Sequence, residues 1–341
     1  MRDYTGQTIY LGMDVHKKSY SVTAICSGVI VKRDRLPANP KELLKYCKRF
    51  FPNGEIQSAY EAGFCGFGLH RFLIEHEIHN IIANPASIAI QMNSRVKTDK
   101  IDSLKIAQEL SKGSLVGIYI PSCEQEAARS VSRLRGMFVK ERSRCVNRIK
   151  GFLNFHGVDV KLKSLSKKSC KLLRELCLSA DTQFCLNLML DEWEKASKNV
   201  GECDQRLKQQ SAKDELEIYY KSIPGVGKTI ARVLSNELGD MTQFANEKRL
   251  SSYCGLTPSE YSSGEKVRRG HITRQGKPSL RMYLTQAAWR AIRKDSALEE
   301  AFNRIAIQAG PKKAIQAIAR KLICRARACV LKKEIYQVGK K

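Results

Sequence analysis

Four carboxylates occupy positions suited to metal binding. Asp14 ends an apolar run in LGMDVHKK, Glu61 ends another in SAYEAGF, and Asp99 and Asp102 lie in VKTDKIDSLKIAQEL. The i, i+3 spacing of the last two places both on one face of a helix. Carboxylate oxygens are the ligands that Mg²⁺ prefers, and two such ions activate a nucleophile and stabilise a leaving oxygen in phosphodiester chemistry.

Each carboxylate also has a purely structural interpretation. Asp99 suits a helix N-cap and Asp102 a favourable charge in the first turn, while Asp14 and Glu61 suit solvated strand ends. Taken together, in this order and in a strongly basic chain, the four residues favour a Mg²⁺ site.

The elements that must position these carboxylates follow from apolar periodicity. Alternating apolar residues predict strands, and i, i+3/i+4 spacing predicts helices. The predicted elements are strands at 8–15, 19–26 and 29–33, a helix at 41–51, a strand at 56–60, a helix at 67–77 and a strand at 79–83. Three antiparallel strands followed by alternating helices and strands predict an α/β domain with a mixed sheet.

The composition and periodicity of the chain change after this domain. Residues 124–155 and 184–220 are long, charged and periodic, with a predicted loop near 157–166. This pattern is typical of a helical hairpin or coiled coil, which serves either as a dimerisation arm or as a spacer. We therefore predict three domains, at 1–123, 124–217 and 218–341.

The charge of the chain indicates a polyanionic partner. Its 60 Lys and Arg residues exceed 34 Asp and Glu, for a net charge of +26, which favours nucleic acid through phosphate neutralisation. Residues 221–341 hold 25 basic and 9 acidic residues, and 266–294 hold nine basic residues and no acidic one. The alternative is a protein whose surface is merely basic, as in ribosomal proteins.

The twelve cysteines are scattered, and no Cys-x-x-Cys occurs, which argues against a zinc site or a disulfide scaffold. No apolar run reaches the roughly 18 residues that span a bilayer, and no signal-peptide pattern is present. We expect reduced thiols, a cytoplasmic protein and no membrane partner.

Two C-terminal motifs suggest phosphate contacts. IPGVGKT lacks the first glycine of a P-loop, since that position is Ser222. Gly225, Gly227 and Lys228 still suit a hairpin that contacts a nucleic-acid backbone, or a tight turn without a ligand. Farther on, Ser262 and Ser263 are either ordinary loop residues or nucleophiles. Basic residues able to clamp a phosphodiester follow them at Lys266, Arg268, Arg269, Arg274, Lys277 and Arg281.

Taken as a set, these motifs resemble a known family. LGMDVHK, YEAGFCG, NPASI, KTDKIDSLKIAQ, SIPGVGKTIARVLSNELGD, YCGLTPSEYSSGEK and GHITRQGKPSLRMYL are similar in order and spacing to the DEDD-type transposases of one insertion-sequence group. That group includes the Piv DNA invertase and the bridge-RNA-guided recombinases. The resemblance covers nearly the whole chain.

The resemblance implies an N-terminal RuvC-like, ribonuclease-H-type domain and a helical or coiled-coil middle. It also implies a mainly α C-terminal transposase domain with a helix-hairpin-helix-like element. The family's acidic positions fall on Asp14, Glu61, Asp99 and Asp102. Its Tyr-x-Ser-Gly motif matches Tyr261–Gly264, so Ser263 is the expected catalytic serine; Ser262 occupies the variable position.

The resemblance further implies that the serine attacks a DNA phosphodiester while Mg²⁺ on the carboxylates acts at the same phosphate, in a site composed of both domains. The phosphoserine link would allow strands to be rejoined without ATP. In the bridge-RNA members, a noncoding RNA pairs with donor and target DNA. The expected partners are therefore DNA, a guide RNA and further copies of the chain, as a dimer or tetramer.

Two alternatives to the transposase hypothesis stay open at this point. One is a Mg²⁺-dependent RuvC-like nuclease or junction resolvase, which hydrolyses DNA and never forms a protein–DNA link. The other is a nucleic-acid-binding protein whose acidic cluster has no catalytic role.

Overall fold

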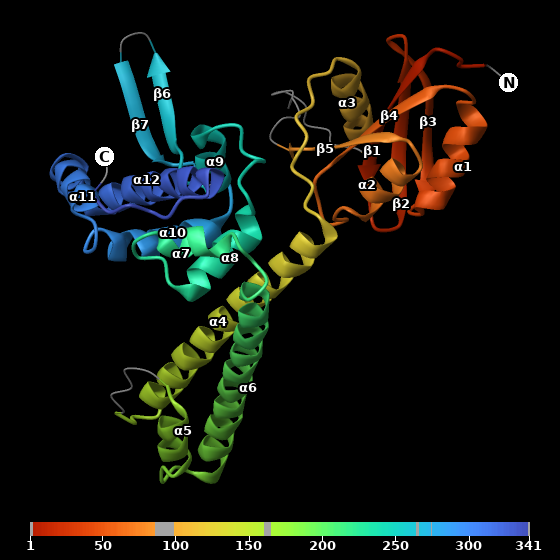
Figure 1. Ribbon diagram of the computed structural model, residues 1–341. Helices are drawn as coiled ribbons and strands as arrows, with labels where there is room; N and C mark the ends of the chain where they lie inside the picture. The colour runs from red at the N-terminus through yellow and green to blue at the C-terminus, as the bar shows by residue number, and fades with distance from the viewer. Residues whose placement is uncertain (1–2, 86–98, 160–164, 264–265, 274, 340–341) are drawn as a thin grey trace. The chain divides into compact units, whose positions relative to one another are not determined.

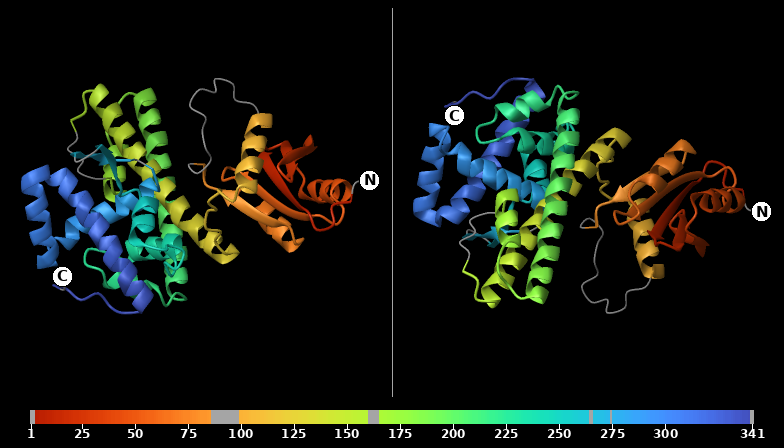
Figure 2. Two further views of the ribbon diagram at one scale, coloured as in Figure 1. Left: turned by 90° about the horizontal axis from the view of Figure 1, so that it is seen from above. Right: turned by 90° about the horizontal axis from the view of Figure 1, so that it is seen from below.

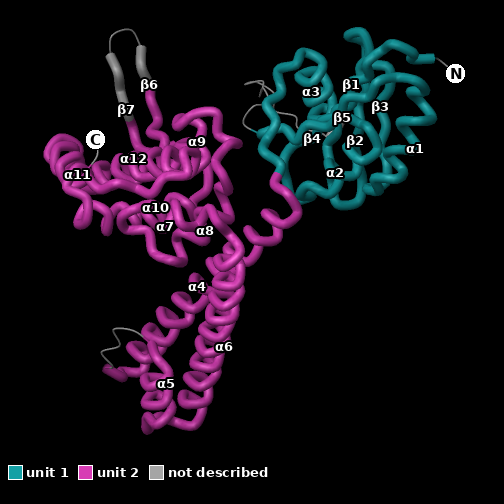
Figure 3. Tube along the Cα trace, in the orientation of Figure 1, with its two compact units in different colours: residues 1–120 teal, residues 121–341 magenta. Residues whose placement is uncertain are grey.

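The structure is a computed structural model that describes residues 3–85, 99–159, 165–263, 266–273 and 275–339. At 99–100, 261–263 and 266–269 only the backbone is described. The chain forms two compact units, Met1–Ile120 and Pro121–Lys341 (Figure 3). No helix in the described part of the chain is long and apolar enough to cross a membrane.

The first unit is built on a five-stranded mixed sheet (Figure 1). Its strands are β1 (Thr8–Val15), β2 (Ser19–Cys26), β3 (Val29–Pro37), β4 (Glu55–Glu61) and β5 (His79–Ala83). They lie in the order β3-β2-β1-β4-β5. The first three pair antiparallel, and β4 pairs parallel with both β1 and β5.

One face of this sheet is covered by α1 (Pro40–Phe50) and α2 (Gly68–Glu75), which supply side chains to the same apolar cluster as the sheet. The side chain of Asn39 caps the first of these helices, and Pro40 at its first position fits a helix start. Their leucines pack against alternate strand residues. In β1 these residues are Ile9, Leu11 and Met13, all fully buried.

The other face is covered by α3 (Asp99–Ser111). Ile106 and Leu110 of this helix form a small apolar cluster with Ala59 of β4, and Tyr10 of β1 packs against it. Because side chains alternate along a strand, the even-numbered residues of β1 and the odd-numbered residues of β4 face α3.

The second unit opens with a long helical hairpin (Figure 2). Its helices are α4 (Cys123–Phe155), α5 (Lys167–Arg174) and α6 (Ala180–Ser211). The long α4 and α6 lie side by side, and buried apolar residues of all three helices form one cluster. The helix predicted at 184–220 is shorter than expected, because α6 ends at Ser211 and a separate helix follows.

The remainder of the unit is mostly helical, with one β-hairpin. Its elements are α7 (Glu217–Ser222), α8 (Lys228–Leu238), α9 (Glu247–Tyr253), β6 (Pro258–Ser263), β7 (Lys266–Ile272), α10 (Pro278–Ala291), α11 (Ser296–Ala309) and α12 (Pro311–Lys332). A core of buried aliphatic residues from α8, α10 and α12 holds it together.

The structure confirms the predicted mixed α/β fold at the N-terminus and a mainly helical remainder. The β6–β7 hairpin was not predicted. The boundary predicted at 123 lies close to the division at 120. The separate domain status of 124–217 stays a prediction, because these residues and 218–341 fall in one compact unit.

Candidate functional site

The strand register brings two of the predicted carboxylates side by side. Met13 of β1 pairs with Tyr60 of β4 in parallel, and Asp14 and Glu61 are the next residue on each strand. Neighbouring strands lie roughly 5 Å apart, and paired residues share a face. Asp14 and Glu61 therefore stand next to each other on the face that α3 covers, with Glu61 exposed and Asp14 half-buried.

A glycine lets α3 approach this face closely. A Cβ atom on Gly12 would lie 2.3 Å from both the backbone nitrogen of Ala107 and the carbonyl oxygen of Ser103 in α3. Any side chain at this position would collide with helix backbone. The contact is completed by a buried hydrogen bond of 2.9 Å between the hydroxyls of Ser103 and Thr23 in β2.

This contact also determines which face receives the second pair of carboxylates. Asp102 comes directly before Ser103, so α3 carries this carboxylate on the same face of the sheet as Asp14 and Glu61. Asp102 is half-buried. Asp99 is the first residue of α3, but its side chain lies outside the described atoms.

One neighbour of this site was missed from the sequence. The Nε2 atom of His16 lies 3.0 Å from Oδ2 of Asp14, and the side chains are 45% and 22% exposed. The signal was available, because residues two apart on a strand point to the same face, and β1 ends immediately before His16. His16 can therefore orient the Asp14 carboxylate.

The donor chemistry of the site fits a hard divalent cation. Asp14, Glu61, Asp99 and Asp102 offer only carboxylate oxygens, which suit Mg²⁺. Among the described side chains, no three Asp, Glu, His or Cys residues form a ready metal site. Asp14, Glu61 and Asp102, whose side chains are described, therefore do not by themselves form such a site.

The serine motif lies at the end of the unpredicted hairpin. β6 ends at Ser263, which pairs with Lys266 of β7, and Ser262 pairs with Val267. The side chains of both serines lie outside the described atoms. Their backbone positions nonetheless place the motif at the tip of a two-stranded ribbon.

The predicted basic residues fall into two groups. Lys266, Arg268 and Arg269 lie along β7, opposite the serine strand, and only their backbone is described. Arg274 is outside the described residues. Arg281 is half-buried, and its Nη1 donates a 3.1 Å hydrogen bond to the carbonyl oxygen of Gly255.

Lys277 belongs to a buried ionic network that sequence reasoning did not identify. Its Nζ lies 3.0 Å from Oε2 of Glu237, a carboxylate that is 2% exposed. Arg133 of α4 donates to both oxygens of Glu237 at 2.8 and 3.0 Å. Arg129 donates to the backbone carbonyls of Asn236 and Glu237 at the end of α8. The network ties α4, α8 and the segment before α10 together.

In the glycine hairpin between α7 and α8, one glycine is packed against another helix and the other is exposed to solvent. A Cβ on Gly225, whose φ is +80°, would lie 2.1 Å from the carbonyl oxygen of Ala287 in α10. Gly227 and Lys228 are exposed where α8 begins. The first glycine serves packing, whereas Gly227 and Lys228 lie on the surface, where a ligand can reach them.

A mixed sheet with adjacent carboxylates, joined to a strongly basic helical unit, is the arrangement of an enzyme that acts on nucleic acid. Sequence comparison identifies the family. Residues 219–303 match the family described as "Transposase IS116/IS110/IS902 family". Residues 11–157 match the DEDD transposase family of IS110, described as "Transposase".

Individual relatives agree with these matches. The y4qE protein of Sinorhizobium fredii is 26% identical over 82% of this chain and 71% of its own length. The transposase for insertion sequence element IS1533 of Leptospira borgpetersenii is 26% identical over 82% and 84%. The transposase for IS1111A of Coxiella burnetii is 27% identical over 56% and 54%.

The chain belongs to the IS110/IS116/IS902 family of transposases. The family places it among enzymes that act on DNA, and the carboxylate-bearing sheet and basic C-terminal region are the parts that such an enzyme needs.

Proposed function

We propose that the chain cuts and rejoins DNA of its insertion sequence, using Ser263 as nucleophile and Mg²⁺ held by Asp14, Glu61, Asp99 and Asp102. The observation that carries this proposal is the register of β1 and β4. It sets Asp14 beside Glu61 on the face that α3 covers.

The sheet supports a RuvC-like, ribonuclease-H-type assignment for the first unit. Three antiparallel strands are followed by two parallel ones, and helices cover both faces. The α7–α8 hairpin with its exposed Gly227 supports the helix-hairpin-helix-like element implied by the resemblance.

Each set of residues has a defined role in the proposed reaction. The carboxylates hold the cation, and His16 keeps Asp14 oriented toward it. Mg²⁺, when bound, supplies positive charge for the phosphate oxygens and lowers the cost of oxyanion formation. Lys266, Arg268 and Arg269 flank the serine strand and hold the DNA backbone.

The covalent step exchanges one ester bond for another. The Ser263 oxygen forms a bond to phosphorus, a P–O bond to deoxyribose breaks, and the serine proton passes through solvent to the departing deoxyribose oxygen. Because the number of phosphate esters is unchanged, the reverse attack by a new DNA hydroxyl rejoins strands without ATP. Ser263 is chosen over Ser262 because it occupies the constant position of Tyr-x-Ser-Gly.

Two partners complete the proposal. A noncoding bridge RNA pairs with donor and target DNA, so that base pairing reads sequence while the protein holds backbones. Recombination requires four strands to be cut, so the active form is a dimer or tetramer. The α4–α6 hairpin is the proposed oligomerisation element.

The decisive assay incubates the purified chain, with its co-purifying RNA and Mg²⁺, with end-labelled DNA from its own element, followed by a denaturing gel. The variants are Ser263→Ala, Ser262→Ala and Asp14→Ala. We expect a protein–DNA adduct with the wild-type chain and with Ser262→Ala. We expect none with the other two variants or after removal of Mg²⁺.

The assay separates the alternatives. Cleaved DNA without an adduct, unaffected by either serine change, would identify a Mg²⁺-dependent nuclease or junction resolvase. DNA binding that is indifferent to Asp14→Ala and to metal, with no cleavage, would indicate a binding protein.

A further inference from the structure

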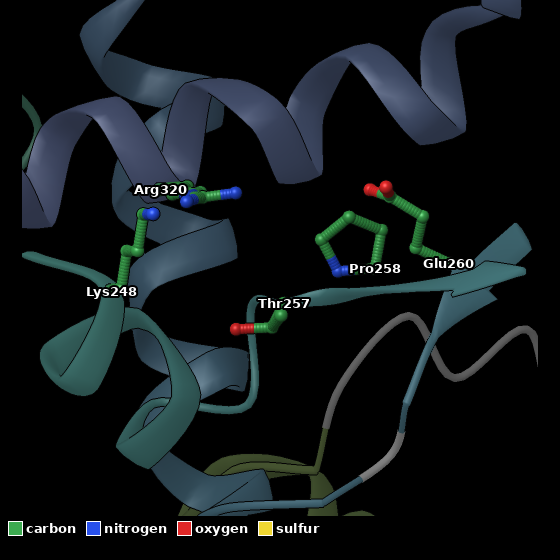
Figure 4. A pocket seen from close by; sticks show the side chains of 5 residues that line it. All are labelled: Lys248, Thr257, Pro258, Glu260 and Arg320. Carbon is green, nitrogen blue, oxygen red and sulfur yellow. The ribbon is translucent and has the colours of Figure 1, made fainter. Parts of the chain in front are cut away.

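A cavity of about 430 Å³ lies at the base of the β6–β7 hairpin (Figure 4). Three elements contribute to it: Lys248 belongs to α9, Pro258 and Glu260 to β6, and Arg320 to α12. Thr257, which directly precedes β6, completes the lining. No residue of this cavity is among the predicted catalytic or nucleic-acid-binding residues.

The cations of this cavity are not paired with a carboxylate in the described part of the chain. Neither Lys248, which is exposed, nor Arg320, which is half-buried, forms an ion pair or hydrogen bond with any described side chain. Other basic residues of the unit behave differently. Lys277 and Arg325, for example, are paired with Glu237 and Asp295.

A third donor is buried beside them. The Oγ1 atom of Thr257 is inaccessible to solvent, yet it has no hydrogen-bond partner among the described residues. Leaving a buried hydroxyl unsatisfied costs about 1–3 kcal/mol. Figure 4 shows this hydroxyl on the side of the cavity where Lys248 lies. Because solvent does not reach this hydroxyl, a ligand does not reach it either, and the cavity offers a ligand the two positive charges of Lys248 and Arg320.

The acidic residue of the cavity is separated from this cluster. Figure 4 shows the carboxylate of Glu260 at the end opposite Lys248, and Glu260 has further interactions of its own. The cavity is therefore polarised, with an anion-attracting end formed by Lys248 and Arg320.

We propose that this polarised end binds a backbone phosphate of the nucleic acid on which the chain acts. This inference rests on the proposed function. A phosphodiester offers the negative charge and several acceptor oxygens that two neighbouring cations bind together. A lone metal cation or an apolar group would leave these donors unsatisfied.

The bound phosphate is distinct from the one that is cut. Ser263, the last residue of β6, lies six residues beyond Thr257 in the chain, which is roughly 20 Å of extended backbone. Lys248 and Arg320 are thus positioning residues, which anchor the nucleic acid at the base of the hairpin whose tip carries the serine motif.

The test compares charge-matched variants. Lys248→Gln and Arg320→Gln each remove one cation from the cavity, and Arg249→Gln and Lys321→Gln remove the neighbouring, exposed cations that do not line it. The binding of a fluorescent DNA duplex, and of a single-stranded RNA of the same sequence, is measured by anisotropy over a series of salt concentrations.

We expect each cavity variant to weaken binding roughly tenfold and to reduce the salt dependence of log Kd by about one unit. The neighbouring variants should change little. If the cavity variants lose affinity for only one of the two probes, DNA or RNA, that probe identifies which nucleic acid supplies the bound phosphate.

Equal binding by the cavity and neighbouring variants would overturn the inference while leaving the proposed function intact. A wild-type chain that binds neither DNA nor RNA would instead refute the proposed function, and the inference with it. Melting curves of all variants exclude misfolding as the cause of weak binding.

Discussion

Glu237 is a single buried carboxylate that forms ion pairs with cations from two other segments of the second unit. Burial by itself raises the pKa of Glu237, but hydrogen bonds from Arg133 and the charge of Lys277 outweigh burial and hold the pKa below its ordinary value. The ionised form is therefore favoured in the folded state, and it compensates cations contributed by α4 and by the segment before α10.

A pH-dependent stability follows from this lowered pKa. A carboxyl group whose pKa is lower in the folded state contributes stability above its unfolded pKa, and this contribution is lost as pH falls through the folded value. We expect the free energy of unfolding to fall as pH drops below about 4.5, the ordinary pKa of a glutamate. Urea titrations at pH 7 and pH 4 measure it.

Glu237→Gln tests whether this residue is responsible. The variant should be about 1–3 kcal/mol less stable at pH 7, because it weakens the charge-assisted hydrogen bonds from Arg133 and Lys277 while both cations stay partly solvated. It should also lose less stability between pH 7 and pH 4 than the wild-type chain. A variant with the full acid sensitivity of the wild type would assign that sensitivity to other carboxylates.

At the scale of elements, the packing of α3 on the sheet determines which face its carboxylates occupy. The helix meets β1 backbone to backbone at Gly12, and the buried pair of Thr23 and Ser103 ties it to β2. The site therefore depends on a contact in which no predicted catalytic residue takes part.

Gly12→Ala should displace α3 from the sheet. The new methyl group would lie 2.3 Å from helix backbone, and overpacking of this kind costs about 1–3 kcal/mol. We expect lower stability together with loss of DNA cleavage, since Asp102 and Asp99 move with the helix. Thermal unfolding and the adduct assay give the two readouts.

Gly68→Ala is the matched control, because a Cβ at Gly68 meets nothing within 4 Å. It lies in the same unit, at the start of α2, and should leave both stability and cleavage unchanged. If Gly12→Ala behaved like this control, the close approach of α3 would not matter for the site.

At the scale of the whole molecule, charge and carboxylate chemistry are divided along the chain. Residues 1–120 contain 16 basic and 11 acidic residues, and residues 221–341 contain 25 and 9. The positive charge that attracts nucleic acid therefore lies mainly in the C-terminal third, whereas the four carboxylates lie in the first unit.

This division predicts that removing the metal affects DNA cleavage and DNA binding differently. EDTA should abolish cleavage and adduct formation but leave the affinity for DNA nearly unchanged, because binding is supplied by phosphate neutralisation. The affinity should instead fall steeply with added salt. Anisotropy and gel assays on the same samples measure both, and a large loss of affinity in EDTA would contradict the division.

Local patterns were sufficient for much of the first unit. The strands predicted at 8–15, 19–26 and 79–83 are those observed, because alternation of apolar residues reports directly which face of a strand is buried. Asp14 and Glu61 could be selected for the same reason, since each lies at or next to the end of a strand predicted from this alternation.

Helix ends and short ribbons were less predictable. The charged segment 184–220 has helical composition throughout, yet α6 stops at Ser211, where the chain turns so that Glu217 and Asp214 can pair with buried Arg232. The β6–β7 hairpin was not predicted, because its serines and glycines are equally typical of loops.

The sequence alone determined the class of fold, the strand ends that carry carboxylates, and the basic character of the C-terminal third, because residue type and local periodicity encode all three. Three contacts could be found only in the tertiary structure. They are the close approach of α3 to the backbone of β1 at Gly12, the ion pair of Lys277 with Glu237, and the cavity that Lys248 and Arg320 line together. These contacts join residues far apart in the chain, and their existence depends on how whole elements pack.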